Sequence, residues 1–303
     1  MEQTLVIRRT GEMNREEIRC VQEAANRKAL LVRRGRTAVL IGLNILVSLF
    51  VLLPLLYAVS VAFMPSSELF TTHMNLLPSS PTLENFRQAL IKVPLARFVA
   101  NSFMVAGLIT LGQIISCSLA AFSFSFLDFK GKEALFMLVM ATMMIPGESI
   151  VLSNYLTMGE LGLLDTYVAM ILPSLASATT IFFMRQAFLQ TPRELYEVAT
   201  MEGCSSLRFL LAIQIPLSKG AMGAVGIYTF INAWNAYMWP LLVTNTDKMR
   251  TVQIGIGMLL DAESADYNVM MAGVIIVMLP TLLLFTFGQK YILSGALSGA
   301  MKG

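Results

Sequence analysis

Amide and aromatic side chains recur along one late apolar stretch of this 303-residue chain. Asn232, Asn235 and Trp239 are spaced to fall near one face of a helix, and Tyr228 precedes Asn232 by four residues. Amides hydrogen-bond to hydroxyl groups and aromatic rings stack on the apolar face of a sugar, so this set suits a neutral polyol. The alternative is that Trp239 anchors a membrane interface and the asparagines join neighbouring helices.

Glu148 is a clear acid inside another apolar stretch, directly after Pro146 and Gly147. It either lines or gates a pathway, or hydrogen-bonds backbone groups that the Pro–Gly break leaves free. Carriers coupled to protons or ions usually place several acids and bases at mid-membrane. The scarcity of such groups makes a stand-alone ion-coupled carrier the less favoured interpretation.

Residues for catalysis or metal binding are not evident. His73 is the single histidine, and Gly131-Lys132 lacks the upstream glycine of a phosphate-binding loop. We therefore expect no metal site, no cofactor bound by this chain, no enzymatic activity and no nucleic-acid partner. Active transport would require an ATPase on another polypeptide.

A polar segment interrupts the apolar pattern at residues 191–216. Thr191 is placed to cap a helix, with Glu194 three residues later as in a capping box. Gly203 supplies a left-handed stop, and Ser205 or the serine after it could cap a second short helix. The pattern predicts a compact helix pair at the membrane surface.

The first helix of this pair has a face suited to a partner protein. Leu195, Ala199 and Glu202 share that face, where the small Ala199 would permit close approach. Glu194 and Glu197 could pair with basic residues of the partner. The alternative is an amphipathic loop that lies on the bilayer.

The elements that must position these residues are membrane helices, because 56% of the residues are hydrophobic and only 14% are charged. The sequence predicts an all-α polytopic membrane protein with six spans of about 20 residues or more. We expect the spans at Thr37–Met64, Phe98–Leu127, Ala134–Met158, Tyr167–Gln190, Leu217–Val243 and Val269–Leu293.

Basic residues predict the orientation. They concentrate in residues 1–36 and in the loops after the second and fourth predicted spans. Both termini are therefore expected in the cytoplasm. The expected organisation is a basic N-terminal extension (1–36), a six-helix transmembrane domain (37–293) that includes the segment 191–216, and a cytoplasmic tail (294–303).

The polar segment resembles the coupling motif of permease subunits from binding-protein-dependent ABC importers. The motif residues are Glu197-Val198-Ala199, Gly203 and Ile213-Gln214-Ile215-Pro216, with the family's spacing. The resemblance implies a MetI-like fold and a role in ATPase coupling for Glu194, Glu197, Ala199, Glu202, Gly203 and Pro216. It also implies that this segment lies between the fourth and fifth spans and docks in a cleft of the ATPase.

Within that family the chain resembles the second, maltose-type permease of carbohydrate importers. The matching stretches include Asn101-Ser102-Phe103, Leu163-Leu164-Asp165-Thr166-Tyr167 and Trp239-Pro240-Leu241-Leu242. The resemblance implies a heterodimer with a second permease, two ATPase subunits that use ATP and Mg²⁺, an extracytoplasmic solute-binding protein, and a bacterial cell membrane. The expected cargo is a sugar or oligosaccharide. Glycerol-3-phosphate or a related polyol phosphate is the alternative.

Overall fold

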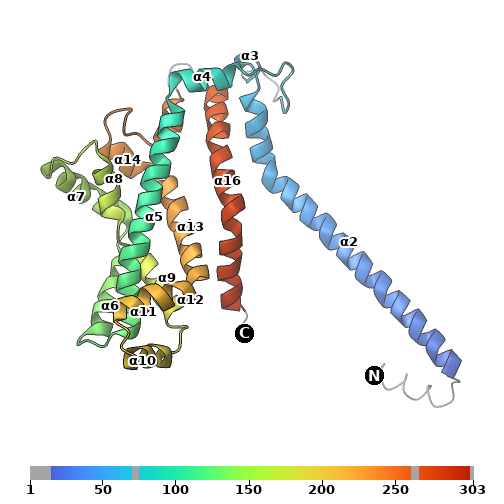
Figure 1. Ribbon diagram of the computed structural model, residues 1–303. Coiled ribbons are helices and arrows are strands. Elements are labelled where there is room, and N and C mark those ends of the chain that lie inside the picture. Colours follow the sequence, from blue (N-terminus) through green and yellow to red (C-terminus); the bar gives the residue numbers. More distant parts are fainter. Residues whose placement is uncertain (1–14, 70–74, 261–265, 301–303) are drawn as a thin grey trace. The chain divides into compact units, whose positions relative to one another are not determined.

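The computed structural model describes residues 15–69, 75–260 and 266–300, and every regular element in those ranges is a helix (Figure 1). The chain divides into two units, residues 1–58 and 59–303, which are described separately. The helices in chain order are α2 (Arg15–Ala62), α3 (Ser66–Leu69), α4 (Glu84–Lys92), α5 (Leu95–Phe126), α6 (Lys132–Ala141), η1 (Thr142–Met144), α7 (Gly147–Glu160), α8 (Tyr167–Ile171), η2 (Leu172–Ser174), α9 (Ala178–Phe188), α10 (Arg193–Met201), α11 (Ser206–Phe209), η3 (Leu210–Gln214), α12 (Ile215–Leu217), α13 (Lys219–Trp234), α14 (Met238–Val243), α15 (Val252–Met258) and α16 (Tyr267–Ala300).

The first unit is dominated by α2, whose 48 residues include Pro54. Its apolar part, Thr37–Ala62, is long enough to cross a membrane. Residues 15–36 continue the same helix, so the described part of the basic extension is a helical continuation of the first predicted span.

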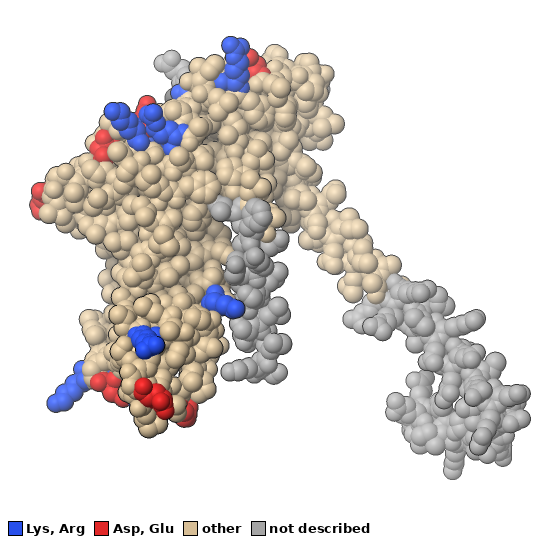
Figure 2. Space-filling model, viewed as in Figure 1, with Lys and Arg blue, Asp and Glu red and all other residues tan. Residues whose placement is uncertain are grey.

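The second unit is built around α5. This helix packs against α9 and α13, α13 packs against α16, and α16 packs against α4. Figure 1 shows α4 lying across the ends of α5 and α16, with α10 at the opposite end of the bundle. On the face seen in Figure 2, charged side chains lie toward the two ends of this unit, with an uncharged belt between them.

Two of the predicted spans are broken helices, and the fifth predicted span begins at a third bend. The two parts meet at 97° in Lys132–Met144 with Gly147–Glu160, at 49° in Tyr167–Ser174 with Ala178–Phe188, and at 84° in Ser206–Leu217 with Lys219–Trp234. Within the described residues, two helices are long and apolar enough to cross a membrane, or five if each bent pair is one span. The apolar part of α16 in that range, Tyr267–Leu283, is shorter, so six spans stay a prediction.

Proline explains the sharpest break. Pro146 disfavours a helical conformation in the residue before it, and Ile145 is extended with φ −84° and ψ 118°. The helix restarts at Gly147. The single helix expected over Ala134–Met158 is therefore two helices. The one expected over Leu217–Val243 also ends early, because α13 stops at Trp234 and α14 begins only at Met238.

Candidate functional site

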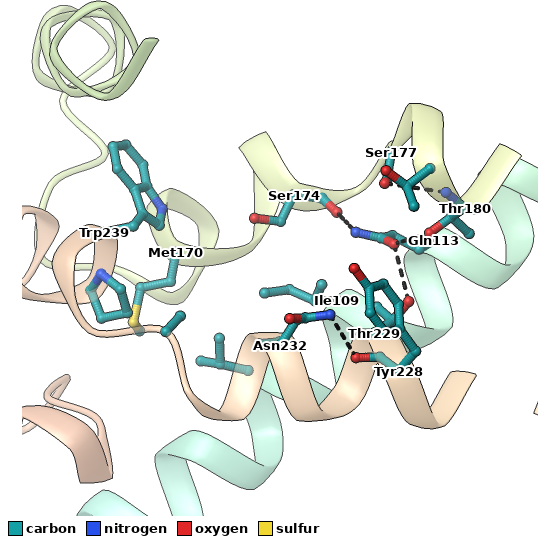
Figure 3. Close-up of a pocket in the computed structure, with 15 residues that line it drawn as sticks. Ile109, Gln113, Met170, Ser174, Ser177, Thr180, Tyr228, Thr229, Asn232 and Trp239 are labelled. Atoms are coloured by element: carbon teal, nitrogen blue, oxygen red, sulfur yellow. Dashed lines mark hydrogen bonds between the residues drawn. The ribbon is translucent and has the colours of Figure 1, made fainter. Parts of the chain in front are cut away.

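A cavity of about 330 Å³ opens between α5, the α8–α9 break, α13 and α14 (Figure 3). None of its fifteen lining side chains is an acid, lysine, arginine or histidine. It combines hydroxyl, amide and aromatic groups with an apolar remainder. The lining residues are Val105, Ile109, Gln113, Met170, Ser174, Ser177, Thr179, Thr180, Tyr228, Thr229, Asn232, Ala233, Ala236, Trp239 and Pro240.

Gln113 joins three walls of this cavity (Figure 3). Its Nε2 donates to the carbonyl of Ser174 at 2.7 Å. Its Oε1 accepts from the hydroxyls of Thr180 at 2.9 Å and Thr229 at 3.3 Å. Because the buried Gln113 amide oxygen accepts two hydrogen bonds, this side chain holds α5, α9 and α13 in one relative position. Gln113 was missed in the sequence, although an amide in the middle of an apolar span is itself a signal.

Polar side chains of α5 also explain why the bend before α9 is tolerated. Ser116 donates to the carbonyl of Leu175 at 2.5 Å, and the Cys117 thiol lies 3.7 Å from the carbonyl of Ser177. Together with Gln113 they pair with carbonyls that the break releases from the helix ladder. The break thereby brings Ser177, Thr179 and Thr180 to the cavity wall.

Three of the predicted pathway residues line the cavity. Asn232 donates to the carbonyl of Tyr228 at 3.0 Å, one turn earlier in α13. The Trp239 indole donates to the carbonyl of Ala169 at 3.1 Å, which fixes the ring beside the cavity. The prediction that Asn232 and Trp239 lie on one face of a single helix is wrong, because α13 ends at Trp234 and Trp239 belongs to α14.

Two other predicted pathway residues lie elsewhere. Asn235 does not line the cavity, and its Oδ1 accepts from Gln253 at 3.3 Å. Glu148 does not line the cavity either; it is exposed in the first turn of α7. The structure therefore brings Tyr228, Asn232 and Trp239 together and separates them from Asn235 and Glu148.

The predicted helix pair is present at the far end of the bundle, but its start differs from the expectation. Pro192, not Thr191, occupies the N-cap position of α10, and no side chain caps this helix. Thr191 instead donates its N–H to the carbonyl of Phe188, so it extends the end of α9. The predicted capping box with Glu194 is therefore wrong.

The turn and the second cap match the expectation. Gly203 has φ +78°, the left-handed conformation that ends a helix. The Cys204 N–H donates to the carbonyl of Ala199 at 2.9 Å, which closes the turn. Ser205 caps α11, where its hydroxyl accepts from the N–H of Arg208 at 3.4 Å.

The inner face of α10 packs on the chain itself. Tyr196 lies 5.0 Å from the ring of Phe209 and 5.4 Å from that of Phe126. Ala199 is partly buried against the same cluster, so it belongs to the inner face and does not share an outer face with Leu195. The aromatic cluster fixes α10 to the ends of α5 and α11.

The outer face of α10 is both charged and apolar. Val198 is 51% and Met201 is 79% exposed, and neither was among the predicted contact residues. Glu194 and Glu202 are exposed as well. Glu197 is exposed too but pairs within the chain, at 3.4 Å from Arg193.

Arg193 forms a second ion pair, with Asp128 in the loop after α5. The hydrogen bond and charge of Asp128 raise the pKa of the guanidinium above its ordinary value, and Glu197 adds to this effect. Pro216 lies apart from these groups, in α12. Among the described residues, no three His, Cys, Asp or Glu side chains form a metal-binding group, and His73 lies outside those residues.

A bundle of broken apolar helices around an uncharged polar cavity is the architecture of a membrane transport subunit. The chain belongs to the family of inner membrane components of binding-protein-dependent transport systems, whose model matches residues 112–295. This match covers the helix pair and the cavity lining from Gln113 onward, and only the lining residues Val105 and Ile109 precede it.

Relatives and a solved structure support the assignment over most of the chain. A sn-glycerol-3-phosphate transport system permease from Brucella abortus is 35% identical over 256 residues, 82% of this chain and 91% of the relative. An arabinooligosaccharides transport system permease from Halalkalibacterium halodurans is 33% identical over 253 residues, with the same shares. A bacterial ABC transporter that imports alginate has the same fold, with a TM-score of 0.73, 22% identity, and coverage of 84% of this chain and 94% of that one.

Proposed function

We propose that this chain is the permease subunit through which an ATP-driven ABC importer moves a carbohydrate into a bacterial cell. The observation that carries the proposal is the α10–α11 segment (residues 193–209). It is a helix pair at one end of the bundle, buried on one face and exposed on the other. The sequence has no phosphate-binding glycine-rich loop, so ATP and Mg²⁺ are used by partner ATPases.

The exposed face of α10 is the surface proposed to dock into an ATPase. Val198 and Met201 supply apolar contacts, while Glu194 and Glu202 supply charge. Because Tyr196 packs on Phe209 and Phe126, a force on α10 reaches α5 and the helices behind α11. ATPase closure would thus be transmitted to the walls of the cavity.

The remaining partners follow from this role. A second, non-identical permease would complete the transmembrane path, two ATPases would bind the permease pair, and a solute-binding protein would deliver the cargo from outside. With six spans, both termini and the α10–α11 segment would face the cytoplasm, where the basic residues concentrate. The chain itself would have no catalytic role.

The carbohydrate class is supported by the arabinooligosaccharide relative and by the uncharged polar cavity. Glycerol-3-phosphate is the second candidate, favoured by several relatives that carry that name at 34–35% identity. A polyol phosphate would require cationic groups along its path, supplied by residues outside this cavity.

Substitution of Gly203 tests the coupling role. Among the described residues, no atom outside its immediate neighbours lies within 4 Å of a Cβ placed there, so beyond the backbone strain at φ +78° a side chain would make steric contact only with a docked partner. Gly203→Leu should abolish ATP-driven uptake by the reconstituted importer while membrane insertion persists. Gly203→Asn is the matched control, because asparagine tolerates positive φ and is smaller. Normal uptake in the leucine variant would contradict the coupling role.

A further inference from the structure

The relatives transport cargoes of different charge, and the cavity offers a way to choose between them. We propose that it binds one uncharged sugar unit of the cargo through Tyr228, Asn232 and Thr179, and that it discriminates against phosphate and carboxylate groups. This inference rests on the proposed function and narrows its substrate class.

Several polar groups on the cavity wall are available to hydrogen-bond a cargo molecule. No hydrogen bond within the described residues engages the Tyr228 hydroxyl, the Asn232 Oδ1, or the hydroxyls of Ser174 and Thr179. In Figure 3 the Tyr228 ring and the Asn232 amide lie on the same side of α13, facing the α8–α9 break. Three hydroxyls and an amide oxygen are neutral donors and acceptors, and sugar hydroxyls are their chemical complement.

The residues that line the cavity include no charged side chain that could pair with an anion. Arg185 lies further along α9 but is already engaged: its Nε donates to the carbonyl of Phe124 at 3.3 Å, and its guanidinium pairs with Glu133 at 3.6 Å. It also lies 4.1 Å from the centre of the Phe136 ring. A phosphate dianion entering the cavity would lose hydration without gaining a cation, which is strongly unfavourable.

The start of α9 does not replace that cation. The Ser177 hydroxyl already accepts the N–H of Thr180 at 3.4 Å, and the Thr180 hydroxyl donates to Gln113. These two hydroxyls help to hold the break together. They and the other hydroxyls near the start of α9 are neutral, so they supply no positive charge to balance an anion.

The size of the cavity and its aromatic surface suit a single sugar ring. A volume of about 330 Å³ is at the small end of ligand pockets, which span roughly 300–1,000 Å³, so it fits a small group rather than a long chain. The Trp239 ring is held at the cavity by its bond to Ala169 and offers an aromatic face. Aromatic faces pack against the C–H groups on the face of a sugar ring, and glycerol-3-phosphate has no such ring.

Direct binding to the permease–ATPase complex, without its solute-binding protein, tests the inference. The complex in nanodiscs would be titrated with arabinotriose, sn-glycerol-3-phosphate and a mannuronate trisaccharide, with binding followed by saturation-transfer NMR. Arabinotriose should bind, and the two anions should bind at least about tenfold more weakly. Asn232→Leu and Thr179→Val should each weaken arabinotriose binding roughly two- to tenfold, the factor carried by one lost neutral hydrogen bond.

Asn154→Leu provides the matched control, because this asparagine lies in α7 and does not line the cavity. It should leave arabinotriose binding unchanged. Undetectable sugar binding, equal or tighter binding of either anion, or loss in the control as large as in Asn232→Leu would each overturn the inference. ATP-driven uptake of the cargo of the solute-binding protein is measured in parallel. If the complex takes up cargo but does not bind the sugar in this cavity, the inference is wrong and the proposed function holds. If the unaltered complex shows no ATP-driven uptake, the proposed function is itself contradicted.

Discussion

Asp165 ties together two loops that are distant in sequence. Its carboxylate accepts from the backbone N–H groups of Asn245 at 2.9 Å and Thr246 at 3.0 Å, and from the Thr246 hydroxyl at 2.8 Å. Desolvation raises the pKa of this carboxyl, but these hydrogen bonds and the charge of Arg250 outweigh it and lower the pKa below its ordinary value. The residue also has φ +58°, a conformation that asparagine and aspartate tolerate.

The lowered pKa predicts a pH-dependent contribution to stability. A carboxyl whose folded-state pKa is depressed stabilises the fold above its unfolded pKa of about 4, and the contribution is lost as the pH falls through the folded value. Asp165→Asn keeps the backbone tolerance but removes the charge, so it should lower the melting temperature at pH 7. The difference from the unaltered protein should shrink below about pH 4. A constant difference between pH 7 and pH 3, measured by thermal unfolding, would contradict this account.

Residue types in the cavity were more predictable than their arrangement. Tyr228, Asn232 and Trp239 could be selected from the sequence because polar and aromatic groups in an apolar stretch need partners. Asn235 was selected for the same reason but lies outside the cavity. Its exclusion depends on the end of α13 at Trp234, and no Pro or Gly follows closely enough to signal that end. Gln113 was missed because its partners come from distant segments.

Helix breaks differ in how completely their polar groups are paired. At the break before α9, Gln113 uses its amide nitrogen once and its oxygen twice. The π-helix η3 precedes Pro216, which cannot donate to the carbonyl four residues earlier, so the helix widens there. Gln214 in η3 is fully buried, donates to Ser218 at 2.9 Å, and leaves Oε1 without a partner among the described residues.

These two buried glutamines should respond to different extents to the same substitution. Gln113→Leu leaves the Ser174 carbonyl and two threonine hydroxyls unpaired and should destabilise the protein by about 1–3 kcal/mol. Gln214→Leu removes an unpaired buried oxygen together with the one hydrogen bond to Ser218, so the two effects offset each other and the loss of stability should be clearly smaller than in Gln113→Leu. Thermal unfolding of the two variants side by side is the measurement. Equal losses of stability would show that pairing does not decide the effect.

Element boundaries were predictable where the chain carries its own signal. Gly203 and Ser205 mark the turn and cap of the helix pair, and both act as expected. The start of α10 was misplaced by one residue because Pro192 fits the N-cap as well as the first helical position. The direction of Ala199 could not be predicted, since it depends on aromatic residues from α5 and α11.

At the scale of the whole molecule, two ends of the second unit differ in what they present. One carries α4 and the other carries the α10–α11 segment, with an uncharged belt between them on the visible face (Figures 1 and 2). Composition alone predicts such a belt, because a chain with so few charges must place them outside the hydrocarbon. The number of membrane crossings is harder to predict, because the count depends on whether each bent pair of helices forms one span.

Native cysteines provide a direct test of orientation. Cys20 lies in the N-terminal part of α2, and Cys204 lies in the turn between α10 and α11. With six spans and basic residues inside, both positions face the cytoplasm. A membrane-impermeant maleimide should therefore label single-cysteine variants at either position in inverted vesicles but not in right-side-out vesicles. Ser80→Cys in a cysteine-free chain, on the exposed loop before α4, should show the reverse pattern.

Labelling of Cys20 and Cys204 from opposite sides would exclude an even number of crossings between them. Labelling of both from outside would invert the topology and remove the α10–α11 segment from reach of any cytoplasmic ATPase.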